Sequence, residues 1–478
     1  MDILNDTENI TISQDIQTVI TSELAWHYLI IPHSRDRQSV TFHISNEIEY
    51  GQTKDELQLI LNKDINFIPT PPDSIQKALK KYYRKSDSKS SQVTTVPDMS
   101  DDFVGKLVSE AKGLGSSDIH IEVYDDKARI RIRIDGHLVE RYRLDKSEYP
   151  ALINKIKIKA NLDIAEKRLP QDGRIFFNSH GHQFDIRISV LPTLHGEKVV
   201  MRLLSNDASN IHIENLGFSE IELRNYLEGV RKPHGIMLIS GPTGSGKTTT
   251  LYATLKVLNE EKRNVLTVED PIEYTLEGIN QVQLRESIGL TFASALRTFL
   301  RQDPDVIMLG EIRDAETAQM AIRAALTGHL VLSTIHTNSA WGTISRLIDM
   351  GIPPFLLSST LNTSVAQRLI RKLCVYCKRV STLEGKLPLH YKPIRSVEQV
   401  FEPVGCSSCH YTGYSGRKAL YEVIPIDREL ADCIRNGVSD VDEILRSRNI
   451  KPLADHAFEL LESGISSAEE IYPLLMNH

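Results

Sequence analysis

The 478-residue sequence predicts an α/β protein in which a doubly wound α/β domain follows a small α+β domain and an N-terminal α/β unit. Three observations support this fold class. At roughly 150 residues per domain, the length divides into about three domains. Strand-like and helix-like segments alternate from residue 235 to about residue 365, as in a doubly wound sheet. Residues 118–122 and 128–134 instead alternate with period two, as half-buried antiparallel strands do.

The N-terminal unit, residues 1–83, is predicted to be a small docking domain. Residues 39–44 have the character of a strand, while residues 55–62 and 74–83 have helical spacing. The unit contains no catalytic constellation, which favours a role in docking. Residues 84–98 are polar and rich in serine, so they are predicted to form a flexible linker, because such a stretch cannot bury enough apolar surface to fold by itself.

Residues 99–230 are predicted to form the small α+β domain. A helix is expected from Phe103, followed by paired strands at residues 118–122 and 128–134. Further strand signals occur at residues 174–177, 183–190 and 198–204.

Residues 231–478 are predicted to form the doubly wound domain. After the break at Pro233, residues 236–239 form a short apolar run of the kind that is buried on both faces of a parallel sheet. Within this domain we expect a cysteine-bearing element at about residues 370–412. A helical region is expected at about residues 424–478.

The strongest motif is a phosphate-binding loop of the pattern G-x-x-x-x-G-K-[ST] between a strand and a helix-like run. Its backbone N–H groups would turn toward phosphate oxygens, Lys247 would reach the β and γ phosphates, and the Thr248 hydroxyl would complete a magnesium shell. The sequence therefore predicts binding of ATP with Mg²⁺. The residues expected to hold the nucleotide are Gly241, Pro242, Thr243, Gly244, Ser245, Gly246, Lys247, Thr248 and Thr249.

Two carboxylates follow predicted parallel strands, where they would meet the nucleotide. Glu311 ends the apolar run from Asp305 and is interpreted as the carboxylate on the metal side. Glu269 follows residues 264–268 and is a candidate to orient or deprotonate the attacking water. Acids after strands are also common helix caps, which is the alternative interpretation.

His336 follows another strand-like run, residues 330–335, and could report on the γ-phosphate. The alternative is a hydrogen-bonded structural histidine. Its distance from His329 along the chain is not the spacing of a metal site.

Four of the five cysteines form two C-x-x-C pairs, namely Cys374, Cys377, Cys406 and Cys409. Four thiolates in this pairing suit a closed tetrahedral Zn²⁺ site, and a redox dithiol is the alternative. Cys433 stands alone in an apolar helical pattern, so we expect it to contribute only to packing.

Composition and charge exclude several classes of protein. The 41% apolar and 25% charged content excludes collagen-like, mucin-like and wholly disordered chains. The formal net charge of −7 argues against general nucleic-acid binding. The N-terminus lacks a secretory signal and no apolar run reaches about 18 residues. We therefore expect a cytoplasmic protein whose membrane contact is peripheral or made through a partner.

Taken in order, the motifs resemble one family, the cytosolic ATPases of type II secretion and type IV pilus assembly. The resemblance runs from about Ser116 toward the C-terminus and weakens beyond Tyr421. The residues that carry it are 117–122, 133–136, 171–174, 241–248, 269–273, 301–305, 310–314 and 327–329.

This resemblance implies a RecA-like P-loop domain, a PAS-like α+β domain before it and a homo-hexameric ring. It implies that Glu311 lies in the Walker B segment, that Glu269 activates water and that His336 belongs to a histidine box. Arg187 and Arg202 would close over the nucleotide, with Arg297, Arg301 and Arg313 supporting the site.

Such motors act on inner-membrane platform and cytoplasmic-anchor proteins, so recruitment to the inner membrane is expected. The cysteine element favours the assembly and secretion members over the retraction motors, and the small N-terminal unit looks more like that of a secretion motor.

A nucleic-acid translocase or DNA-uptake ATPase is the alternative function. Such a protein should carry clustered Lys and Arg with interleaved aromatic residues. Here residues 80–85 form the only compact basic cluster, and the aromatic content is 6%. We therefore expect no direct contact with nucleic acid, and ATP-stimulated binding to DNA would contradict the motor interpretation.

Overall fold

The computed structural model divides the chain into two compact units, Met1–Gln92 and Val93–His478. It describes residues 10, 16, 19–20, 22–36, 39–46, 50–61, 63–72, 74–75, 78–79, 94–95, 102–179, 182–204, 211–383, 386–388, 391, 397 and 399–476. The predicted linker at residues 84–98, except for 94–95, and the basic cluster at residues 80–85 lie outside the described residues.

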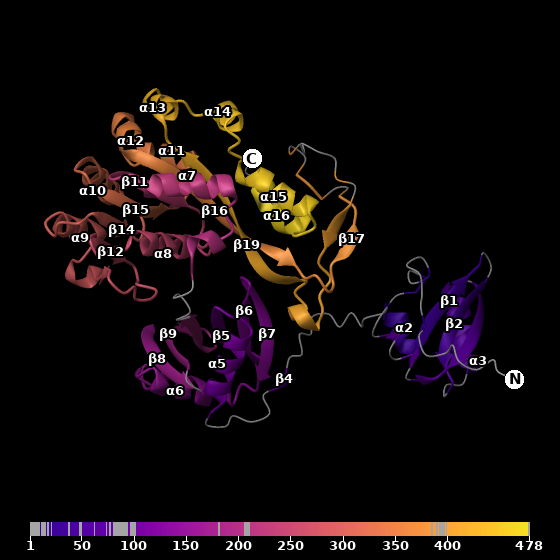
Figure 1. The fold of residues 1–478 in the computed structure, drawn as a ribbon. Helices are drawn as coiled ribbons and strands as arrows, with labels where there is room; N and C mark the ends of the chain where they lie inside the picture. The colour runs from indigo at the N-terminus through magenta and orange to yellow at the C-terminus, as the bar shows by residue number, and fades with distance from the viewer. Residues whose placement is uncertain are drawn as a thin grey trace. The chain divides into compact units, whose positions relative to one another are not determined.

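The first unit contains a three-stranded sheet and the helices α2 (Ser22–Tyr28) and α3 (Tyr50–Leu61) (Figure 1). Strands β1 (Ile30–Arg35) and β2 (Ser39–Ser45) are antiparallel, whereas β2 and β3 (Asp64–Thr70) are parallel. A parallel pair needs a crossover connection, and α3 provides it. Fully buried Phe42, Ile44 and Leu57 join the sheet to the helix.

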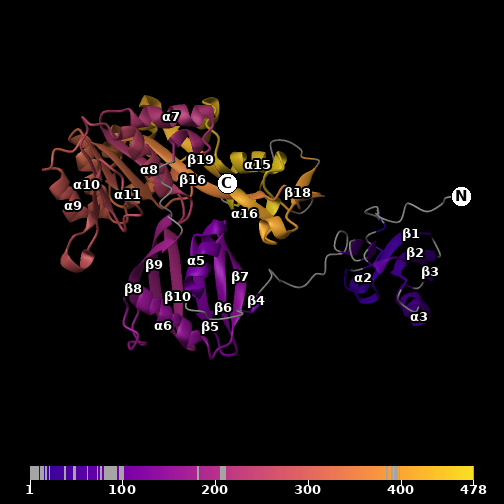
Figure 2. The same ribbon diagram turned by 60° about the horizontal axis from the view of Figure 1, so that its bottom comes forward.

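The second unit begins with a seven-stranded sheet of order β4-β7-β6-β5-β10-β9-β8. Alternate residues of β6 are buried, which matches the period-two pattern in the sequence. The helices α5 (Phe103–Gly113) and α6 (Tyr149–Lys159) pack on one face of this sheet, in a single apolar cluster (Figure 2). The strands are β4 (Thr94–Thr95), β5 (Asp118–Val123), β6 (Ala128–Ile134), β7 (His137–Leu144), β8 (Gln171–Ser179), β9 (His182–Thr193) and β10 (Gly196–Leu204). We call residues 102–204 the small domain.

A second seven-stranded sheet, of order β13-β12-β14-β15-β11-β16-β19, organises residues 211–476, which we call the P-loop domain. Its strands are parallel except for the pair β16 and β19. Every residue of β11, β12, β14 and β15 is buried, as expected for central parallel strands. The strands are β11 (Gly235–Ser240), β12 (Val265–Glu269), β13 (Asn280–Gln283), β14 (Val306–Leu309), β15 (Leu330–Ile335), β16 (Leu361–Leu373) and β19 (Tyr414–Pro425).

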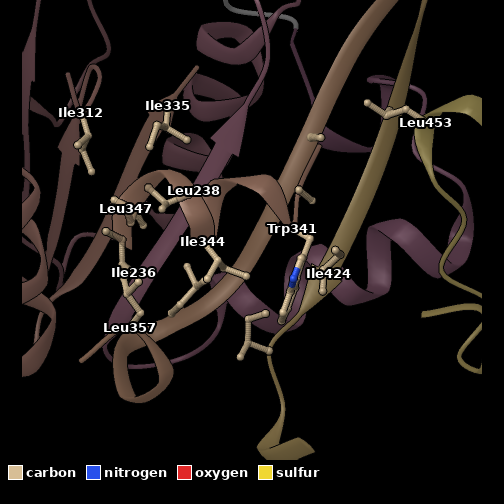
Figure 3. Close-up of a cluster of buried hydrophobic side chains, with 14 of the residues drawn as sticks. Ile236, Leu238, Ile312, Ile335, Trp341, Ile344, Leu347, Leu357, Ile424 and Leu453 are labelled. Atoms are coloured by element: carbon tan, nitrogen blue, oxygen red, sulfur yellow. The ribbon is translucent and has the colours of Figure 1, made fainter. Parts of the chain in front are cut away.

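Helices cover both faces of this sheet, which confirms the α/β fold class. Met237 and Ile239 face α7 (Glu220–Val230) and α8 (Lys247–Leu258). Ile236 and Leu238 face the opposite cluster (Figure 3). That cluster is built with α9 (Phe292–Phe299), α10 (Ala315–Leu326), α11 (Gly342–Asp349) and α12 (Pro354–Thr360), and it continues into α13 (Arg428–Arg435), α14 (Asp442–Ser447), α15 (Leu453–Glu462) and α16 (Ala468–Leu475).

The edge of the sheet differs from the expectation drawn from the sequence. The antiparallel strand β19 extends the sheet beyond the alternation that ends near residue 365, whereas the helical region begins after Pro425, close to the expected start at about residue 424. The pairing of β16 with β19 joins residues from 62 positions apart, Thr363 with Pro425, to 41 positions apart, Leu373 with Tyr414, so local periodicity could not show it. Between them, β17 (Arg379–Ser381) and β18 (Val400–Glu402) form a two-stranded sheet beside the cysteine pairs.

None of the described helices is both long and apolar enough to cross a membrane.

Candidate active site

The phosphate-binding loop connects the carboxyl end of β11 to the amino end of α8. Gly241, Gly244 and Gly246 have positive φ angles of 151°, 81° and 89°, which glycine adopts without strain. A Cβ atom at Gly241 would lie 2.5 Å from the carbonyl oxygen of Gln367 in β16. Glycine backbone therefore forms the turns of the loop and lets it lie close against β16, and a loop of this kind can turn its backbone N–H groups toward a phosphate group.

Lys247, the first residue of α8, is folded over this loop. Its Nζ donates to the carbonyl oxygens of Gly241 and Pro242 at 2.8 and 3.0 Å. Burial lowers the pKa of the Lys247 ammonium, and the nearby Glu311 carboxylate opposes that shift. The amino end of α8 and the Lys247 ammonium therefore both lie at the phosphate-binding loop. This combination of a helix amino end and a cation favours binding of an anion.

A cavity of about 970 Å³ opens beside the loop. Carboxylates from the ends of two parallel strands, His336 and several residues of the small domain face this space. Its lining includes Thr243, Gly244, Gly246, Lys247, Thr248, Thr249, Glu269, Asp270, Glu311, His336, Asp118, Arg133 and Arg202. The structure therefore brings most of the predicted site residues together at the carboxyl edge of the sheet.

Glu269, the last residue of β12, is 3% exposed and is held by three donors. Thr267 Oγ1 and Gln281 Nε2 donate to its Oε1 at 2.6 and 3.1 Å. The Tyr252 hydroxyl donates to its Oε2. Both carboxylate oxygens are thereby oriented, which is what a group acting on one water molecule needs.

Glu311 follows β14 and belongs to a cluster of charged groups at the cavity wall. His336 Nε2 lies 3.4 Å from Glu311 Oε2, and Arg313 forms an ion pair with the same carboxylate. Arg313 Nη1 also lies 3.7 Å from Asp270. Arg313 therefore contacts two carboxylates that line the cavity.

The two arginines expected from the small domain occupy different places. Arg202 on β10 lines the cavity, and its Nε pairs with Asp118 of β5 at 3.0 Å. Arg187 on β9 is directed to the segment after β12 instead, where it donates to the Ile272 carbonyl oxygen and pairs with Glu273 at 3.4 Å. Of these two arginines, only Arg202 lines the cavity beside the phosphate-binding loop.

A further contact joins the small domain to the P-loop domain within the second unit. Asp135, in the turn between β6 and β7, accepts a hydrogen bond from the Gly416 backbone N at 2.7 Å. Its other oxygen lies 3.6 Å from Arg417 Nε. Asp135 and Arg417 also line the cavity, so this contact lies at its wall.

The prediction that Arg297 and Arg301 support the nucleotide site is not matched by their positions. Helix α9 turns Phe292 and Leu296 into the core, which leaves Arg297 on its outer face. There Arg297 pairs with Glu316, and Arg301 donates to the Arg297 carbonyl oxygen at 2.9 Å. Neither arginine lines the cavity.

Sequence reasoning missed the three residues that hold Glu269. Thr267 carried a signal, since residues two apart on a strand project to the same side. No signal in the sequence pointed to Tyr252 or Gln281. Each lies on a different element from Glu269, namely α8 and β13, and meets it only in the folded domain.

The four paired cysteines form a compact cluster, with their sulfur atoms all within 4.8 Å of one another. The Sγ–Sγ distances are 3.8 Å for Cys374 and Cys406, 3.8 Å for Cys377 and Cys409, and 3.7 Å for Cys406 and Cys409. A tetrahedron of thiolates at about 2.3 Å from zinc has edges of about 3.8 Å. A disulfide would need about 2.05 Å. The geometry therefore fits a metal ion.

Backbone N–H groups also point at these sulfur atoms. Gly405 N donates to Cys377 Sγ at 3.3 Å, and Gly413 N donates to Cys409 Sγ at 3.3 Å. Such donors stabilise thiolates, the form of cysteine that binds metal. Cys433 lies outside the cluster and packs against the apolar core, as expected.

Comparison with known proteins identifies the family to which this loop and these carboxylates belong. The family described as "Type II/IV secretion system protein" matches residues 98–473. The chain belongs to this family. The match confirms the resemblance expected from the motifs and identifies the chain as a secretion ATPase.

Curated relatives agree with this assignment. Type II secretion system protein E of Pseudomonas aeruginosa is 47% identical over 371 residues, covering 77% of this chain and 74% of the relative. The type IV pilus assembly ATPase PilB of Myxococcus xanthus is 41% identical over 458 residues, covering 90% of this chain and 80% of the relative.

Solved structures share the fold. The ATPase DotB of Legionella pneumophila has a TM-score of 0.61 at 23% identity, covering 81% of this chain and all of DotB. The pilus retraction motor PilT, solved with bound ADP, has a TM-score of 0.52 at 26% identity, covering 77% of this chain and 96% of PilT.

Proposed function

We propose that this chain hydrolyses ATP in the cavity beside residues 241–248 and that it drives assembly of a pilus or pseudopilus. The observation that carries the proposal is the meeting of a phosphate cradle, two strand-end carboxylates and Arg202 around one cavity. Phosphoryl transfer depends on this combination of positioning and charge, since the protein forms no covalent bond to the phosphate.

Each residue has a defined role in this proposal. Residues 241–249 hold the phosphates, with Lys247 as their cation. Thr248 and Glu311 offer the oxygen ligands that Mg²⁺ prefers, and the metal would neutralise charge on the phosphates. Glu269 would orient and deprotonate the attacking water. Arg202 would neutralise charge on the γ-phosphate, and His336 would respond to that phosphate through Glu311.

The N-terminal unit supports type IV pilus assembly as the system served. Residues 93–478 make up about 81% of the chain, and the alignment with PilB covers 90% of it, so that alignment extends into the first unit. The alignment with the secretion protein of P. aeruginosa covers only 77%. This favours a PilB-like role over the secretion role that the size of the unit suggested from sequence.

We further propose that the chain works as a homo-hexamer at the cytoplasmic face of the inner membrane. Platform and cytoplasmic-anchor proteins would recruit it, and the first unit would supply the docking surface. ATP turnover per chain should rise with chain concentration if the ring is the active form, and co-purification with pilus or secretion components would identify the system. ATP-stimulated binding to DNA would instead support the nucleic-acid translocase.

The cysteine cluster is proposed to hold one structural Zn²⁺. Metal analysis of the purified chain should return about one zinc per chain. Cys406→Ser should lower the thermal unfolding temperature while ADP affinity stays near that of the unchanged chain, because the cluster lies outside the cavity lining. Cys433→Ser is the matched control and should retain the zinc. Metal-free protein with a disulfide between the pairs would contradict the assignment.

A further inference from the structure

We propose that Tyr252 is a positioning residue for the Glu269 carboxylate and that it links this carboxylate to Arg187 through the backbone of Glu273. The inference deepens the proposed function, because it rests on Glu269 acting on water during ATP hydrolysis. Neither the loop motif nor the family description assigns a role to this tyrosine.

The first support is the way in which Tyr252 completes the hold on Glu269. The two other donors, Thr267 and Gln281, both bond to Oε1. Tyr252 is the donor to Oε2 among the described residues. A carboxylate bonded at both oxygens cannot rotate about its terminal bond, whereas loss of the Tyr252 hydroxyl would free Oε2. The orientation of Glu269 therefore depends on this contact.

The second support is the environment of the phenol. Tyr252 is fully buried, and its ring stacks edge-on against Tyr274 with centroids 4.5 Å apart. Burial raises the pKa of Tyr252, and the adjacent Glu269 charge raises it further. The hydroxyl consequently keeps its proton and donates to the carboxylate, while the stacked ring has little freedom to move.

The third support is the position of Tyr252 on α8. This helix starts at Lys247, so Tyr252 lies little more than one turn from the residues that hold the phosphates. One rigid element thus spans the phosphate loop and the Tyr252 hydroxyl. It sets the distance between the bound phosphates and the carboxylate that acts on water.

The fourth support is a chain of contacts that reaches the small domain. The Tyr252 hydroxyl accepts a hydrogen bond from the Glu273 backbone N at 3.2 Å. Arg187 pairs with the Glu273 carboxylate at 3.4 Å and also donates to the Ile272 carbonyl oxygen. Arg187 of the small domain therefore contacts the same segment, Ile272 and Glu273, that donates a hydrogen bond to the Tyr252 hydroxyl. A change in that contact would alter the position of the hydroxyl that orients Glu269.

The test is Tyr252→Phe, which keeps the ring and removes only the hydroxyl. A hydrogen bond to a charged group is worth enough to change a rate about 10- to 100-fold. We expect the kcat for ATP to fall by this factor, while KM and the affinity for ADP stay within about twofold. Adding Tyr252→Phe to Glu269→Gln should cause no further loss, because the carboxylate to be positioned is already gone.

Tyr226→Phe is the matched control. Tyr226 is also fully buried, and its hydroxyl also bonds to α8, at Thr254 Oγ1 2.6 Å away. It does not contact Glu269, so its removal should leave kcat unchanged. A double-mutant cycle then tests the link to Arg187, and the losses caused by Tyr252→Phe and Arg187→Ala should be less than multiplicative.

Each contrary outcome points to a different error. Full activity of Glu269→Gln would refute the proposed function of Glu269 itself. If Glu269→Gln is inactive but Tyr252→Phe retains the normal kcat, the positioning proposal is wrong. A large loss of ADP affinity in Tyr252→Phe would overturn it too, since the tyrosine would then support the phosphate loop. Multiplicative losses in the cycle would remove Arg187 from the proposal.

Discussion

Glu269→Gln is expected to bind ATP as tightly as the unchanged chain and to hydrolyse it about 10²- to 10⁴-fold more slowly. The amide has the size of the carboxylate, so the wall of the cavity should stay intact. It cannot accept a proton from water, and its NH₂ group would face a hydroxyl or an amide that now donates to Glu269. Binding and turnover should therefore separate, in single-turnover hydrolysis compared with titration of a non-hydrolysable ATP analogue.

Two further variants distinguish loss of water activation from loss of phosphate binding and of metal binding. Lys247→Ala should abolish productive turnover and weaken nucleotide binding as well, because the phosphate cradle loses its cation. Glu311→Gln should resemble Glu269→Gln in keeping nucleotide binding, but its loss should depend on the Mg²⁺ concentration. Glu260→Gln is the control, since this carboxylate pairs with Lys262 at 3.0 Å outside the cavity lining. An unchanged rate in Glu269→Gln would leave that residue as a structural acid.

Arg202→Ala should lower ATP hydrolysis by about 10³- to 10⁵-fold, the range measured for arginines that neutralise transition-state charge in P-loop enzymes. The residue reaches the cavity from the small domain, so it can act only when that domain lies over the loop. Folding and zinc content should not change, because the side chain is 59% exposed and its partner Asp118 keeps a second contact to Arg133 at 3.5 Å.

The matched control for Arg202 is Arg143→Ala. Arg143 belongs to the same sheet, is also 59% exposed and also pairs with a carboxylate, Glu140 at 2.7 Å. It does not line the cavity, and its removal should leave the rate unchanged. Steady-state rates should be measured over a range of chain concentrations. Full activity of Arg202→Ala would exclude closure of the small domain, and a rate per chain that stays constant down to the monomer would exclude the ring.

Local sequence was sufficient for the parts of the site that lie next to one another along the chain. The phosphate loop needs only a strand, eight residues and a helix, so Gly241 and Lys247 could be assigned from spacing. Glu269 and Glu311 could be assigned because parallel strands end at a common edge. The two cysteine pairs could be matched because tetrahedral coordination by four thiolates has a recognisable spacing.

Other parts depended on contacts between distant segments. Tyr252 reaches Glu269 only because α8 packs against the sheet, and Gln281 reaches it only because β13 pairs with β12. Arg297 is the opposite case, because the family resemblance implied a place at the nucleotide, whereas the apolar face of α9 turns it outward to Glu316.

Amino-acid order alone thus predicted the fold class from periodicity and the phosphate loop and the two cysteine pairs from spacing, and the order of the motifs carried the resemblance to the family. The antiparallel edge strand β19, the separate directions of Arg187 and Arg202, and the hold of Tyr252 on Glu269 emerged only from the folded chain. The physical reason is that side-chain direction at such positions is set by burial against elements tens of residues away, and single-chain periodicity carries no information about which distant elements meet.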